Sequence, residues 1–150
     1  MGQPSNRQIN NPSGVTSMNS VHVDDYFKAL SSRDKLGIAP HFAEGIVLHG
    51  PIYADVIEGR DAVVAILSGF IETIETLEVN LSITSDRDVA VFFTFARDGI
   101  TVQGNERLHL DDDGLIDSIT VAWRPLPAAV ALQEIFAAKM GFPVMHLVTE

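Results

Sequence analysis

Cysteine is absent and basic residues are few in this chain of 150 residues. Without cysteine, disulfide bonds and thiol chemistry are excluded, and the redox compartment stays open. Lysine and arginine number 10 against 20 aspartates and glutamates, which gives a formal net charge of −10. Because so acidic a chain repels phosphate backbones and anionic lipid, we expect it to bind neither nucleic acid nor membranes.

Long apolar runs are missing as well. No stretch approaches the roughly 20 apolar residues of a membrane-spanning helix. The N-terminus is polar and lacks the apolar centre of a signal peptide, so we predict a disordered tail over residues 1–19 and a cytoplasmic protein. The five histidines show no metal-ligand spacing, and we predict neither a metal site nor a cofactor.

The apolar residues that are present change their spacing half-way along the chain. Helical spacing predicts helices over 21–31 and 60–75, and Asp34 can cap a shorter helix over 34–42 between them. Alternating spacing predicts strands over 46–49, 77–84, 89–96, 100–110 and 115–124. We expect the strand over 77–84 to be half-buried through Leu77, Val79, Leu81 and Ile83. Residues 50–58 hold a proline and no periodicity, which predicts a loop.

After the last strand, Pro125 and Pro127 favour the start of an alanine-rich helix that ends near Met140. The predicted architecture is α+β, with three N-terminal helices packed on a curved antiparallel sheet and one C-terminal helix. The chain is long enough for one domain with a sizeable core.

The order of short motifs in the first half carries a resemblance to a known superfamily. The motifs are Tyr26-Phe27, Phe42-Ala43-Glu44 and Glu58-Gly59-Arg60. Their order and spacing resemble the nuclear-transport-factor-2-like (SnoaL-like) cone fold, which includes ketosteroid isomerase, limonene epoxide hydrolase and polyketide cyclases. The resemblance covers about residues 21–124 and implies a cone domain over 20–125 with an apolar pocket. Residues 126–150 would then pack on this domain or on a partner subunit.

Ketosteroid isomerase gives the sharpest comparison. Its oxyanion-hole tyrosine falls on Tyr26, its second oxyanion donor on Glu106, and a pocket tryptophan of some members on Trp123. Its catalytic base falls on Gly50, so the resemblance implies an oxyanion-type donor pair without the family's base. The last-strand acid of the hydrolases and cyclases falls near Val121, so neither of those mechanisms transfers.

Strand alternation supports a pocket around Glu106 independently of that comparison. The neighbours that would face inward with it are almost all apolar: Val91, Phe93, Phe95, Leu108, Ile119, Val121 and Trp123. A carboxyl in such surroundings resists ionisation, because desolvation disfavours the charged form. Two alternatives stay open: a register slip of one residue turns Glu106 outward, and Tyr26 is then a helix-face aromatic. Gly50 and Asp55 are predicted to lie beside the pocket, where Asp55 either reaches in or is solvated.

The C-terminal segment holds more apolar residues than one helix face can bury. They are Leu126, Val130, Leu132, Ile135, Phe136, Met140, Phe142, Val144, Met145, Leu147 and Val148. This excess predicts either a lid over the pocket or a contact with a second subunit. Cone-fold proteins often pair through the outer face of the sheet, so the resemblance also implies a homodimer.

Two functional hypotheses follow. In the first, the protein binds a small apolar or aromatic molecule and acts as an isomerase- or cyclase-like protein, with Tyr26 and Glu106 donating hydrogen bonds to a ligand oxygen. In the second, it is a non-catalytic dimerising module whose pocket is vestigial. Gly50 and the apolar C-terminus favour the second hypothesis, and the donor pair favours the first.

Overall fold

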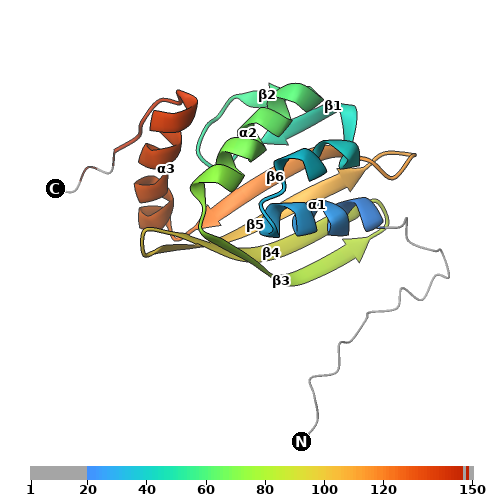
Figure 1. Cartoon of the computed structure of the whole chain (residues 1–150), viewed down its shortest axis with the longest axis horizontal. Helices are drawn as coiled ribbons and strands as arrows, with labels where there is room; N and C mark the ends of the chain where they lie inside the picture. The colour runs from blue at the N-terminus through green and yellow to red at the C-terminus, as the bar shows by residue number, and fades with distance from the viewer. Residues whose placement is uncertain (1–19, 147, 149–150) are drawn as a thin grey trace, which may run out of the picture.

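The computed structural model describes residues 20–146 and 148 and is drawn in Figure 1. Its helices are α1 (Val21–Ser31), α2 (Arg60–Thr73) and α3 (Leu126–Met140), with two single 3-10 turns, η1 (Lys35–Gly37) and η2 (Ala39–His41). Its strands are β1 (Phe42–His49), β2 (Val56–Glu58), β3 (Thr76–Ser85), β4 (Asp88–Arg97), β5 (Ile100–Leu110) and β6 (Ile116–Arg124). The tail predicted over 1–19 lies outside the described residues. Within them, no helix is both long enough and apolar enough to cross a membrane.

The strands form one sheet in the order β2-β1-β6-β5-β4-β3. Neighbouring strands are antiparallel, except that β1 and β6 run parallel. The sequence predicted an antiparallel sheet throughout. The exception arises because α2 and four other strands separate β1 from β6 along the chain, so no hairpin sets their direction.

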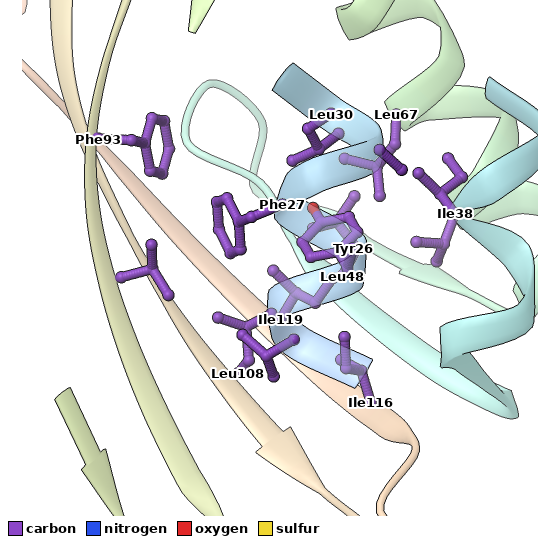
Figure 2. Close-up of a cluster of buried hydrophobic side chains, with 14 of the residues drawn as sticks. Tyr26, Phe27, Leu30, Ile38, Leu48, Leu67, Phe93, Leu108, Ile116 and Ile119 are labelled. Atoms are coloured by element: carbon purple, nitrogen blue, oxygen red, sulfur yellow. The ribbon is translucent and has the colours of Figure 1, made fainter. Parts of the chain in front are cut away.

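Helices α1 and α2 lie on the same face of the sheet, and α3 stands at one end of it (Figure 1). The buried positions of α1 include Val23, Tyr26, Phe27 and Leu30, whose spacing of three and four residues forms one apolar stripe. Figure 2 shows this stripe facing the sheet residues Phe93, Leu108 and Ile119. These side chains belong to the core that joins both layers. The predicted α+β architecture is therefore confirmed.

The segment predicted as a helix over 34–42 is instead the two short turns η1 and η2. A continuous helix is broken here because Pro40 has no N–H to donate and disfavours helical geometry at the residue before it. The predicted cap at Asp34 is present, since its carboxylate accepts a hydrogen bond from Gly37 N at 3.1 Å. The loop predicted over 50–58 also contains β2, which pairs with β1.

Strand β3 is not half-buried as predicted. Val79 pairs with Phe93 but Leu81 pairs with Phe92, so Asn80 is an extra residue that forms a β-bulge. The Thr94 hydroxyl donates to the Asn80 side-chain oxygen at 2.9 Å beside this bulge. The bulge turns Leu81 to the outer face, opposite to Val79, and both side chains are exposed. A local pattern cannot foresee this, because a bulge reverses the alternation that the prediction assumed.

Helix α3 packs against α2, β5 and β6. It buries Ala129, Leu132, Phe136 and Ala137, and it ends at Gly141, whose φ of 77° is the left-handed conformation that glycine adopts readily. The predicted C-terminal helix is therefore present, and the structure places it against the core of the same chain.

Candidate functional site

An apolar cavity lies between the sheet, α2, α3 and the loop after β1. Its wall consists of Leu48, Pro51, Ile52, Tyr53, Ile66, Leu67, Phe70, Phe93, Glu106, Val121, Trp123, Phe136, Met140 and Phe142. The space open to the centre of a water-sized sphere is about 40 Å³, and all the empty space between the walls, solvent at the mouth included, is about 470 Å³. The first value corresponds to a few water molecules, so a larger ligand would also occupy the mouth of the cavity.

Tyr26 and Glu106 meet beside this cavity, with Glu106 in its wall and Tyr26 behind it, although 80 residues separate them. The Tyr26 hydroxyl donates to Glu106 Oε2 at 3.5 Å, and both side chains are buried. This hydrogen bond is long, since O–H···O bonds are usually about 2.7 Å. Because the bond is weak, it leaves part of the hydrogen-bonding capacity of both groups unused.

Burial raises the pKa of the Glu106 carboxyl to about 8, and the hydrogen bond from Tyr26 lowers this pKa only in part. Among the described residues no lysine, arginine or histidine forms an ion pair with Glu106. Burial, followed by the neighbouring Glu106, raises the pKa of Tyr26 well above its usual value. At pH 7 both groups therefore carry a proton and can donate it in a hydrogen bond.

Trp123 supplies a third polar group to the wall. Its indole Nε1 is buried and has no hydrogen-bond partner among the described residues. A buried N–H without a partner is uncommon in folded proteins and invites an explanation such as a water or a ligand. The ring is held by Phe95 at 5.1 Å and by Phe136 at 5.6 Å between ring centroids.

The structure places the residues that the sequence proposed for the site in three groups. Phe93, Glu106, Val121 and Trp123 line the cavity. Tyr26, Phe95, Leu108 and Ile119 are buried next to it but do not form its surface. Asp55 is exposed on the loop before β2 and lies outside the wall. Gly50 is also outside the wall, because the ring of Tyr53 packs against it.

Several wall residues escaped the sequence analysis. Tyr53 was overlooked because it lies in a loop without periodicity, and no local signal marks its contact with Gly50. Phe70 belongs to the apolar positions whose spacing predicted the helix over 60–75, and that spacing does not distinguish a core residue from a cavity wall. Phe136, Met140 and Phe142 belong to the apolar C-terminal excess, and that excess was the available signal that the segment covers the cavity.

Comparison with known proteins identifies the fold and a family. The SnoaL-like domain family matches residues 23–119 of the chain. No curated protein matches the sequence.

Three solved structures illustrate the fold. An uncharacterised protein with a cystatin-like fold from Silicibacter pomeroyi DSS-3 is 22% identical, with a TM-score of 0.76 over 80% of this chain and 85% of that one. A steroid delta-isomerase from Pseudomonas aeruginosa is 21% identical, with a TM-score of 0.75 over 80% of this chain and 89% of that one. SalBIII, an epoxide hydrolase/cyclase-like enzyme of pyran ring formation in the polyether salinomycin, is 24% identical, with a TM-score of 0.59 over 69% of this chain and 88% of that one. At such identities the likeness concerns the fold.

Proposed function

The chain belongs to the SnoaL-like domain family, and on that basis we propose that it binds a small apolar molecule through one oxygen atom, which accepts hydrogen bonds from Tyr26 and Glu106. The observation that carries this proposal is the pair itself. Its two oxygens lie 3.5 Å apart in an otherwise largely apolar site. A ligand oxygen can therefore lie within hydrogen-bonding distance of both.

The chemistry of the pair favours a carbonyl or phenolic oxygen. Two neutral donors in a dry site stabilise partial negative charge on an acceptor, which is how an oxyanion hole acts. The steroid isomerase and cyclase-like proteins among the similar structures make a carbonyl-bearing ligand a reasonable class to test. Within the described wall, Glu106 is the sole carboxylate, so the wall holds no second carboxylate that could act as a base. Binding and polarisation of the oxygen are thus better supported than proton abstraction.

We expect 2-tetralone, a small apolar ketone, to bind and to change the fluorescence of Trp123, the only tryptophan in the chain. Tyr26→Phe should weaken binding about 3- to 10-fold, the effect of one hydrogen bond. Wild-type affinity should fall about tenfold per pH unit above pH 8, where Glu106 loses the proton that it donates. Glu106→Gln keeps a donor, so its affinity should not change with pH in this range. Titrations between pH 6 and 9.5 measure all three effects.

Asp55→Asn is the control for this titration, because it removes an exposed carboxylate outside the wall and should leave the affinity profile unchanged. The proposal fails if 2-tetralone does not bind at millimolar concentration. It also fails if Tyr26→Phe and Glu106→Gln both bind as the wild type does across the pH range.

We propose as a second candidate that the outer face of the sheet joins two copies of the chain, which is the dimerising role considered above. Leu81, Ile83 and Phe92 share this face, because Leu81 pairs with Phe92 while the adjacent Phe93 points into the core. Their side chains are exposed by 51%, 46% and 40%. Large apolar groups exposed together on one face favour association.

Leu81→Lys should therefore convert a dimer to a monomer that remains folded. Val79→Lys is a matched control on the same strand, because Val79 is 40% exposed but lies on the opposite face. Sedimentation equilibrium at micromolar concentrations measures the oligomeric state. A monomeric wild type, or equal effects of both variants, would remove the support for this candidate.

A further inference from the structure

Gly50 leaves a space that another side chain fills. The inward-facing Leu48 lines the cavity and His49 is exposed, so alternation places the missing side chain of Gly50 on the inner side. A Cβ atom built on Gly50 would overlap Cζ and the hydroxyl oxygen of Tyr53, well inside the 3.0 Å that real Cβ contacts keep. The phenol end of Tyr53 thus occupies the place where a side chain at position 50 would begin.

The ring of Tyr53 is held in this place from the other side. It stacks on Phe142 with ring centroids 4.6 Å apart and an interplanar angle of 18°. Phe142 follows α3, and its segment is tied back to that helix by the buried Gln133. The Gln133 side chain accepts a hydrogen bond from Met145 N at 3.0 Å and donates one to Met145 O. Tyr53 is therefore positioned between Gly50 and a segment that the tertiary structure anchors.

The Tyr53 hydroxyl is free to bind a ligand atom. Within the described part of the chain it has no hydrogen-bond partner, and Tyr53 shares the cavity wall with Glu106. Tyr26 is fully buried, whereas Tyr53 and the adjacent Phe142 are half-buried. Tyr26 lies on α1 and Tyr53 on the loop between β1 and β2, so the two hydroxyls come from different elements around the cavity.

We propose that Tyr53 is a second ligand-binding group of this cavity, seated in the space left by Gly50, and that the ligand carries a second acceptor oxygen. This inference rests on the proposed function, in which Tyr26 and Glu106 bind the first oxygen. It narrows the ligand class to apolar molecules that bear two separate oxygen atoms. Burial raises the pKa of Tyr53 to about 12, so the group acts as a hydrogen-bond donor at neutral pH.

Two probes with the same ring system test this inference by calorimetry at pH 7. 2-Naphthol has one oxygen, and 2,6-dihydroxynaphthalene has one at each end. The wild type should bind the second probe about 3- to 10-fold more tightly, the effect of one added hydrogen bond. Tyr53→Phe keeps the ring and its stack on Phe142, so it should abolish this preference while the affinity for 2-naphthol stays within about twofold.

Substitutions of two glycines provide an independent test of the role of Tyr53, one as the variant and one as its control. Gly50→Ala displaces the Tyr53 ring and should also abolish the preference. Gly45 lies on β1, the strand that ends just before Gly50. The Cβ added by Gly45→Ala meets nothing within 4 Å, so this variant should keep the preference. Should Gly50→Ala unfold, as its melting curve would show, Tyr53→Phe decides the question alone.

Failure of this inference and failure of the proposed function give different results. If 2-naphthol binds and Tyr26→Phe weakens it, but Tyr53→Phe leaves both affinities unchanged, the role of Tyr53 is overturned and the proposed function stands. If neither probe binds the wild type at millimolar concentration while 2-tetralone does, the inference is overturned and the proposed function stands. If 2-tetralone does not bind either, both are overturned.

Discussion

The free energy of unfolding of the wild type is expected to fall as the pH rises, and replacing Glu106 by glutamine is expected to remove most of this fall. The pKa of Glu106 is about 8 in the folded protein, against 4.5 for an unperturbed glutamic acid, mainly because the side chain is buried. The contribution of the protonated Glu106 to the free energy of unfolding is therefore fully present below pH 4.5. It is lost as the pH rises through 8. The slope between these values is about 1.36 kcal/mol per pH unit.

The whole effect amounts to at most about 5 kcal/mol, because the two pKa values lie about 3.5 pH units apart. Glutamine has nearly the same shape as the protonated glutamic acid, but its side chain does not ionise. Glu106→Gln should thus match the wild type near pH 4.5 and exceed its free energy of unfolding by several kcal/mol above pH 8. Urea unfolding of both proteins between pH 4.5 and 9 measures the difference.

Glu44→Gln is the control, because Glu44 is exposed on β1 and its substitution should leave the wild-type profile in place. Parallel curves for the wild type and Glu106→Gln would contradict a raised pKa at Glu106. A confirmed effect would show that the chain keeps a destabilising acid in its cavity, which is typical of functional sites.

Phe136→Ala is the second substitution with a large expected effect. Phe136 is buried, stacks on Phe70 with centroids 5.9 Å apart, and contacts Trp123. Removing a buried phenylalanine side chain typically costs 3 to 5 kcal/mol, because apolar burial is lost and a cavity remains. We expect a loss of this size in chemical unfolding, with red-shifted Trp123 fluorescence as water reaches the indole.

Leu126→Ala is the matched control in α3, because Leu126 is 64% exposed, and its substitution should change stability by less than about 0.5 kcal/mol. A loss below about 1 kcal/mol for Phe136→Ala would mean that α3 is only loosely attached. The expected result makes α3 a part of both the core and the cavity wall, so that truncation before this helix would disrupt the domain as well as the site.

Local periodicity predicted much of this fold, and particular elements show where it sufficed. The bounds predicted for α1 and β5, residues 21–31 and 100–110, are those of the structure. Alternation along β5 showed which residues share a face with Glu106 but left open whether that face is buried, and the structure places Glu106 on the cavity wall. Alternation failed on β3, where the bulge at Asn80 reverses the face of Leu81.

The sequence by itself determined the α+β class, the helix stripe that carries Tyr26 and the apolar side of the strands, because these depend on the spacing of residues close together in the chain. It also showed that Gly50 has no side chain to act in the pocket. Only the tertiary structure decided what fills that space. Tyr53 reaches it because Phe142 stacks on its ring and Gln133 holds the segment of Phe142 in place. The contact of Tyr53 with Phe142 joins residues about 90 positions apart, and no local pattern encodes it, since it forms only when the whole core has packed.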